Sequence, residues 1–243
     1  MIKEAFQWIM DRAEINTKDV NGVTYTTDCL SPVFDPKFNR PETLVFHTLS
    51  GLVAYIVGFN YQETYHFLEA DYFCHILNHN EVVLTSTLIQ QAGNVRHKDA
   101  SAKNTETAFN FGSWYNLEDF IIAIQSQFIE DENTNGILGM LGNLANEQVR
   151  TAKDDGFTQS LQVKTGITTK SNVEIKNPVT LRPYRTFREV DQPEGKFILR
   201  FQDRGGLQCA LFESDGGAWK IEAIKNIKDY LEWGIPDGVK VFG

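Results

Sequence analysis

The alternation of apolar and polar residues along the chain predicts a mixture of helices and strands. Residues 1–15, MIKEAFQWIMDRAEI, carry apolar side chains at helical spacing and predict an amphipathic helix. Three prolines interrupt residues 21–42, so we expect an extended arm there with at most one short strand. The pattern then predicts a strand over residues 42–48 and a short helix over residues 48–59.

Two apolar-alternating runs flank Asn78-His79-Asn80 within DYFCHILNHNEVVLTSTLI, which predicts a β-hairpin. The polar residues 93–107 are typical of a loop. The strongest helical pattern is WYNLEDFIIAIQSQF, where Asn116 occupies the cap position and Glu118 and Asp119 lie in the first turn. We expect a further helix over residues 136–149.

Residues 157–212 alternate at period two and predict several strands, and residues 215–234 predict a closing helix that ends at Gly234-Ile235-Pro236. This partial segregation of helices and strands predicts an α+β fold with mixed or antiparallel sheets. We expect a β-rich C-terminal half, a few packed amphipathic helices and an extended N-terminal arm. The arm covers residues 1–43 and the body covers residues 44–243, with a division near residue 150 left open.

Composition narrows the class of protein. A chain of 243 residues with 42% hydrophobic residues can bury a core, so disorder is not expected. The net charge of -9 argues against broad non-specific binding to nucleic acid, although a local basic patch is compatible with it. Three widely spaced cysteines indicate reduced thiols, and no apolar run approaches the length of a membrane span. We therefore expect a cytoplasmic protein without membrane association.

The sequence gives no positive sign of catalytic or metal chemistry. Cys74, His75 and His79 lie within six residues, but neighbouring residues of a strand face opposite sides, so we expect no metal. The run GILGMLG lacks the spacing of a phosphate-binding loop and is more typical of close helix packing. No nucleophile elbow is present. We therefore assign no catalytic residue and no cofactor.

The best functional lead is the stretch RPYRTFR. Residues 161–204 hold nine Lys or Arg against five Asp or Glu, in a chain that is acidic elsewhere. Arginine forks bind phosphates and aromatic rings stack on bases, so this stretch predicts a site for an anionic ligand. The alternative is a basic corner stiffened by proline, in which the arginines pair with Glu189, Asp191 and Glu194. The candidate ligand-binding residues are Arg182, Tyr184, Arg185, Phe187 and Arg188.

Several segments resemble one protein family. The segments are NFGSWYNLEDFIIAIQSQF, VKTGITTKSNVEIKNPVTLRPYRTFREVDQPEGKFILRF and ALFESDGGAWKIEAIKNIKDYLE. Together they resemble the YfdQ-like family of phage and prophage proteins, a domain of unknown function. The likeness extends more loosely over the chain beyond about residue 44. It implies a phage-encoded protein made in the host cell cytoplasm, and it carries no catalytic residues over.

From these observations we expect a non-enzymatic phage accessory protein that acts by binding and forms a homo-oligomer. The partner is a phosphate-bearing ligand, either a signalling nucleotide or single-stranded nucleic acid, or else a host defence protein. The alternatives are a structural shell or virion-assembly protein and, less favoured, an enzyme of unknown reaction.

Overall fold

A computed structural model describes residues 42–58, 71–89, 95–144 and 176–243 with their side chains, and a further set of residues by backbone alone. The backbone-only residues are 17–20, 23–26, 145, 148–154, 158–165 and 169–175. The fold is α+β with mixed and antiparallel sheets, as the sequence pattern predicted. The described part of the chain has four helices: α2 (Leu49–Gly58), α4 (Leu117–Gln127), α5 (Glu132–Ala145) and α6 (Trp219–Gly234).

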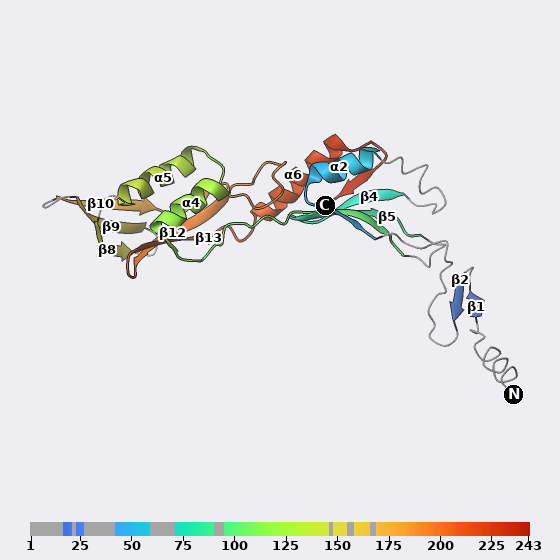
Figure 1. Ribbon diagram of the computed structural model, residues 1–243, viewed down its shortest axis with the longest axis horizontal. Coiled ribbons are helices and arrows are strands. Elements are labelled where there is room, and N and C mark those ends of the chain that lie inside the picture. The colour runs from blue at the N-terminus through green and yellow to red at the C-terminus, as the bar shows by residue number, and fades with distance from the viewer. Residues whose placement is uncertain are drawn as a thin grey trace, which may run out of the picture.

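The largest sheet has five strands in the order β14-β4-β5-β6-β3. The two outer pairs, β14 with β4 and β3 with β6, are parallel, whereas β4, β5 and β6 are antiparallel to one another. Helices α2 and α6 lie together on one face of this sheet (Figure 1). The strands are β3 (Leu44–Phe46), β4 (Tyr72–Asn78), β5 (Glu81–Ser86), β6 (Lys98–Lys103) and β14 (Lys240–Phe242).

A second, antiparallel sheet has the order β11-β12-β13-β7 and is packed against α4 and α5. Its strands are β7 (Tyr115–Asn116), β11 (Val179–Leu181), β12 (Gly195–Asp203) and β13 (Leu207–Glu213). Helix α4 begins where predicted, because the Asp119 backbone N–H donates to Asn116 Oδ1 at 2.8 Å and satisfies one free amide of the first turn.

Two further sheets are described by their backbone. One has the order β10-β9-β8, from β8 (Gln148–Asp154), β9 (Thr158–Thr165) and β10 (Thr169–Lys176). The other is the hairpin of β1 (Thr17–Val20) and β2 (Val23–Thr26), of which only β2 lies within residues 21–42, where at most one short strand was expected. The amphipathic helix predicted within residues 1–15 and the three prolines of the arm lie outside the described residues.

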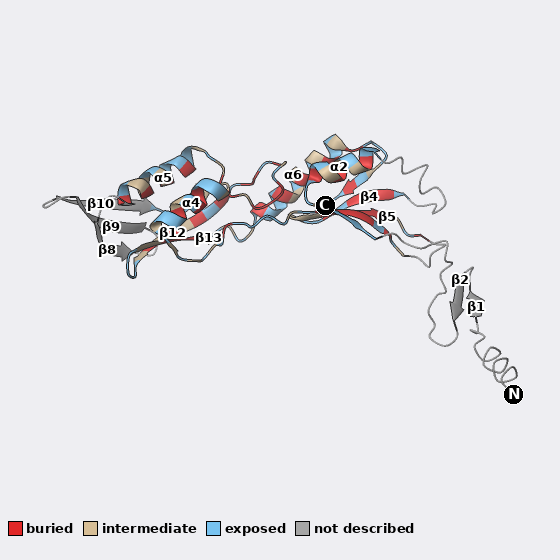
Figure 2. Cartoon of the chain, in the orientation of Figure 1, coloured by how far each residue is buried: buried red, intermediate tan, exposed pale blue. Residues whose placement is uncertain are grey.

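The buried residues form two hydrophobic cores that alternate along the chain (Figure 2). One core lies between the five-stranded sheet and helices α2 and α6, and we call this part of the molecule the site unit. The other core draws on residues 109–144 and 181–211, and we call this part the inserted unit. Segments on both sides of residue 150 share the core of the inserted unit, so that position does not separate the two cores.

Two local predictions were wrong. Residues 93–107 were expected to form a loop, but they contain β6, whose alanines and serine offered no strong apolar signal. The helix expected over residues 136–149 begins at Glu132, because the side chain of Asp131 accepts from the Thr134 backbone N–H at 2.8 Å. It ends at Ala145, shortly before β8.

Candidate functional site

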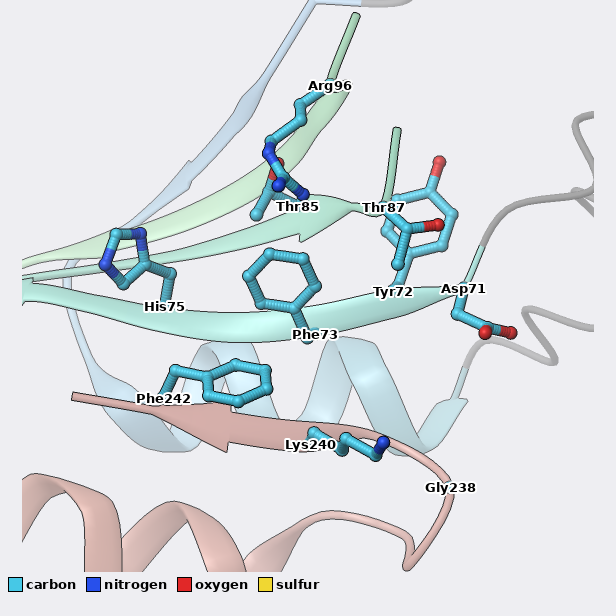
Figure 3. Close-up of a pocket in the computed structure, with 10 residues that line it drawn as sticks. All are labelled: Asp71, Tyr72, Phe73, His75, Thr85, Thr87, Arg96, Gly238, Lys240 and Phe242. Atoms are coloured by element: carbon cyan, nitrogen blue, oxygen red, sulfur yellow. The ribbon is translucent and has the colours of Figure 1, made fainter. Parts of the chain in front are cut away.

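Helices α2 and α6 cover one face of the five-stranded sheet, and they leave the opposite face uncovered. Tyr72, Cys74 and Ile76 of β4 point into the core under α2 and α6. Phe73 and His75 alternate with them and therefore lie on the opposite face, which we call the outer face. In Figure 3 helix α2 lies behind the strands, and Phe73, Phe242 and Arg96 lie in front of them.

Strand pairing places functional side chains in rows across this outer face. Lys240 of β14 pairs with Phe73, which pairs with Thr85 of β5. One row further along, Phe242 pairs with His75. Paired residues lie on the same face of a sheet, so these two rows gather aromatic rings, an ammonium group and an imidazole within two strand spacings.

A cavity of about 610 Å³ lies over these rows. This size lies within the range of small-molecule binding sites. Its lining joins residues from β4, β5 and β14 with residues that precede β6 (Figure 3). The lining residues are Asp71, Tyr72, Phe73, His75, Thr85, Thr87, Arg96, Gly238, Lys240 and Phe242.

The centre of the cavity is aromatic and carries a cation above it. The rings of Phe73 and Phe242 meet edge to face, with centroids 5.3 Å apart and an interplanar angle of 87°. The guanidinium carbon of Arg96 lies 5.5 Å from the centroid of Phe73. Nη1 of Arg96 also donates to the backbone oxygen of Ser86 at 3.2 Å, which holds the guanidinium over the ring.

The charged groups around these rings are available to a ligand. Within the part of the chain that the structure describes, Lys240 and His75 form no ion pair and no side-chain hydrogen bond. The same holds for the carboxylate of Asp71, the single acidic side chain among the described residues of the lining. A ring platform with two cations and an imidazole suits a planar, anionic ligand.

Beneath the cavity, the sheet carries buried polar pairs rather than a proton-transfer site. The hydroxyl of Tyr72 lies 3.2 Å from Nδ1 of His97, and the hydroxyl of Tyr55 donates to Asp99 Oδ2 at 3.0 Å. Burial raises the pKa of Tyr72 well above its usual value, and the charge of Asp99 raises it further. Tyr72 therefore stays protonated at neutral pH and serves as a hydrogen-bonding group in the floor of the cavity.

The cysteines that the structure describes are buried and unreactive. Burial raises the pKa of Cys74 and of Cys209 to about 12, so both stay thiols at neutral pH. Cys74 and His75 face opposite sides of β4, as the alternation predicted. Among the residues with described side chains, no three His, Cys, Asp or Glu groups converge to hold a metal ion.

Arg185, from the stretch singled out in the sequence, lies at the junction of the two units. Its exposed fraction is 4%, and its Nη1 pairs with Glu213 Oε1 at 2.7 Å. Its guanidinium carbon lies 3.9 Å from the ring centroid of Trp219, the first residue of α6, and 5.3 Å from that of Phe197. Burial lowers the pKa of Arg185, and Glu213 opposes this effect. The aromatic rings and Glu213 therefore enclose its guanidinium within the protein.

The other residues of the predicted stretch do not share a surface with Arg185. Phe187 is 1% exposed and belongs to the core of the site unit. Arg188 pairs with Glu106 at 2.5 Å and lies over the ring of Tyr184 at 4.0 Å. Arg182 donates through Nε to the backbone oxygen of Gln192 at 3.0 Å. Each arginine thus has a partner within the chain, and a ligand role for the stretch stays a prediction.

Glu189, one of the acids expected to pair with these arginines, has another role. Glu189 accepts hydrogen bonds from the backbone N–H and the hydroxyl of Ser50, both at 3.2 Å, and so ties the stretch to α2. The arginine partners are Glu213 and Glu106, 28 and 82 residues away in the sequence. Such distant pairs leave no local signal in the sequence.

Sequence reasoning missed the residues of the cavity for a similar reason. The alternation in DYFCHIL places Phe73 and His75 on one face, but it does not say which strand lies beside them. Strand β14 was not predicted, and its pairing with β4 joins residues more than 160 positions apart. Arg96 fell in a segment that was expected to be a loop.

Comparisons with protein-family models, with curated proteins and with solved structures found no match to this chain. The resemblance to the YfdQ-like family therefore stays a prediction. Among the described helices, none combines the length and the apolar composition needed to cross a lipid bilayer.

Proposed function

We propose that the protein is a non-enzymatic binding protein that holds single-stranded nucleic acid on the outer face of its five-stranded sheet. The observation that carries the proposal is the pair of rings, Phe73 and Phe242, with Arg96 and Lys240 beside them in one cavity. Sheet faces that carry aromatic rings bind single strands because the bases stack on the rings, and cations hold the backbone phosphates. Stacking contributes about 1–3 kcal/mol for each base.

The acidity of the whole chain does not oppose this proposal. Long-range repulsion from a net charge of -9 lowers affinity for long polyanions, whereas a short strand senses mainly the charges near it. The charged side chains of the cavity lining are those of Arg96 and Lys240, which are positive, and that of Asp71, which is negative. We propose further that the protein is a phage accessory protein of the host cytoplasm, on the strength of the family resemblance.

The test is binding of fluorescein-labelled eight-nucleotide strands of dT and rU, measured by anisotropy over a range of salt concentrations. Phe242→Ala removes a stacking ring that is 50% exposed, and we expect roughly tenfold weaker binding. Lys240→Gln should lower the slope of log K against log salt by about 0.7, the value for one phosphate contact on a single strand.

The matched control is Lys228→Gln. Lys228 is a cation of α6, on the covered side of the sheet, whose side chain is 40% exposed and whose only described ion pair is with Glu232 at 3.8 Å. This variant should leave both affinity and salt slope unchanged. Equal losses in Lys240→Gln and Lys228→Gln would show that binding follows overall charge rather than this face. Competition by unlabelled UMP and TMP distinguishes a strand from a free nucleotide as the ligand.

We propose self-assembly through β3 as a separate property. Strand β3 is an edge of the five-stranded sheet, and Leu44 and Val45 are 49% and 57% exposed on it. An exposed apolar edge strand is a template for pairing with a second chain. Size-exclusion chromatography with light scattering tests this, because Val45→Lys should convert an oligomer to a monomer. A wild-type monomer would refute the proposal.

A further inference from the structure

We propose that the inserted unit carries a second contact for the same single strand, on the four-stranded sheet β11-β12-β13-β7. This inference rests on the proposed function, because it extends the path of the strand beyond the cavity at β4. The residues of this second contact are Trp114, Lys196, Ile198 and Phe212. The ligand is then a strand long enough to touch both sheets, rather than a free nucleotide.

The second contact lies on the face of the four-stranded sheet that is turned away from α4 and α5. Leu199 of β12 and Leu211 of β13 point into the core under these helices. Ile198 and Phe212 alternate with them and pair with each other across the two strands. They therefore lie on the opposite face, which we call the second outer face.

The second outer face carries an aromatic pair like that of the cavity. The rings of Trp114 and Phe212 meet edge to face, with centroids 6.2 Å apart and an interplanar angle of 72°. Trp114 is 40% exposed. Phe73 carries the guanidinium of Arg96, whereas none of the contacts between cations and rings in the described part of the chain involves Trp114. The indole ring is therefore available to a stacked base.

The charge of the second outer face suits a polyanion. Its charged residues at described strand positions are Lys196 and Arg200, and both are positive. Lys196 is exposed, and its ammonium group forms no ion pair and no side-chain hydrogen bond with any residue whose side chain is described. A chain with a net charge of -9 thus presents a cation without a neighbouring strand carboxylate beside an exposed ring. Such a cation is a contact for a backbone phosphate.

The contacts of Arg185 place the two outer faces on the same side of the molecule. Its guanidinium carbon lies 5.3 Å from the ring centroid of Phe197, which belongs to the core under α4 and α5. The same atom lies 3.9 Å from the ring centroid of Trp219, the first residue of α6. The helix-covered sides of the two sheets therefore meet at the junction, and the opposite faces adjoin on the other side. In Figure 1 the four helices follow one another along the upper side, with the strands of both sheets below them.

The separation of the two ring pairs sets the length of strand that touches both. Phe73 lies six residues, or about 20 Å along a strand, before His79, whose backbone oxygen accepts from the hydroxyl of Thr186 at the junction. Phe212 lies across the junction, next to Glu213. Four nucleotides stacked at about 3.4 Å each cover about 14 Å, so such a strand touches one ring pair only. A strand of 24 nucleotides is long enough for both.

The experiment measures binding of fluorescein-labelled thymidine strands of four and 24 nucleotides to the full chain by anisotropy. Trp114→Ala should weaken binding of the long strand roughly tenfold through the loss of one stacked base, and should change binding of the short strand by less than about twofold. Trp114→Phe keeps a ring and should retain most of the affinity for the long strand. Lys196→Gln should lower the slope of log K against log salt by about 0.7 for the long strand, without a comparable change for the short one.

The matched control is Trp233→Ala, because Trp233 is 88% exposed on α6, on the helix-covered side. This variant should bind both strands as wild type does. If Trp114→Ala binds the long strand as tightly as wild type while Phe242→Ala binds it more weakly, this inference is wrong and the proposed function stands. Equal losses in Trp114→Ala and Trp233→Ala would also refute the inference. Failure of the wild-type protein to bind either strand would refute both.

Discussion

Replacement of Arg185 by alanine tests whether the arginine stretch is a structural junction. The guanidinium forms a buried charge-assisted hydrogen bond to Glu213 and packs on Trp219 at 3.9 Å. The first contact contributes about 1.5–3 kcal/mol and the second about 2 kcal/mol in a desolvated position. Release of a buried charge to solvent offsets part of this sum. We expect a net loss of about 3 kcal/mol in the free energy of unfolding.

For a chain of this length that loss lowers Tm by about 9 °C, which differential scanning calorimetry resolves. Arg185→Lys keeps the charge but loses the planar stacking surface, so it should recover only part of the loss. The matched control is Arg188→Ala, three residues along, because its side chain is 49% exposed and so is that of its partner Glu106 at 54%. An exposed pair contributes at most about 1 kcal/mol.

A Tm of Arg185→Ala within about 1 °C of wild type would refute the junction argument. Equal losses in Arg185→Ala and Arg188→Ala would refute it too, because burial would then not be the cause. A variant that keeps its stability but loses affinity for single strands would restore the prediction that Arg185 is a ligand-binding residue.

Three further predictions follow from local geometry and are checked by thermal unfolding. Gly195→Ala would bring a Cβ to 2.6 Å from Arg185 Nη2 and 2.8 Å from Phe197 Cζ, so it should lower the free energy of unfolding by about 1–3 kcal/mol. A Cβ at Gly139 has nothing within 4 Å, so Gly139→Ala should raise that free energy by up to about 1 kcal/mol through helix propensity. The reverse order of stabilities would contradict this packing. Asn116→Ala removes the cap of α4 and should cost about 1 kcal/mol, while Asn116→Ser keeps a capping oxygen and should recover most of that loss. Burial, Lys220 and Arg185 lower the pKa of His79 in the folded protein, so the unfolded chain binds the proton more tightly, and the contribution of His79 to stability falls as pH drops through the unfolded value near 6.5. His79→Gln should therefore flatten the decline in Tm between pH 7 and pH 5. An unchanged decline would show that His79 does not cause this loss of stability.

The sequence predicted the elements whose determinants are local. Helix α4 carries its own cap and first-turn acids, and the β4–β5 hairpin turns at the predicted Asn78-His79-Asn80. Strand β6 was missed because Ala100, Ser101 and Ala102 are small, and it is stabilised by its two neighbouring strands rather than by its own side chains. Tertiary pairing overrode propensity at this strand.

The cavity was not predicted, because none of its lining residues belongs to the stretch singled out in the sequence. Arginine and aromatic residues were expected to meet, and they do so twice. In RPYRTFR the arginines contact partners within the chain, whereas on the outer face Arg96 and Lys240 line one cavity with Phe73 and Phe242. What distinguishes these two sets of residues is pairing between strands far apart in the sequence. A single sequence carries no local signal of that pairing.

The parallel pairing of β14 with β4 has a consequence for the order of events in the cell. Lys240 and Phe242 are translated after the whole inserted unit, so a growing chain has no complete ring platform until β14 has docked on β4. A ligand that contacts β14 then holds that strand in place by mass action, with a gain that grows as the logarithm of ligand concentration. Occupancy would thus mark molecules in which β14 has docked, and proteolysis of β14 should slow as occupancy rises.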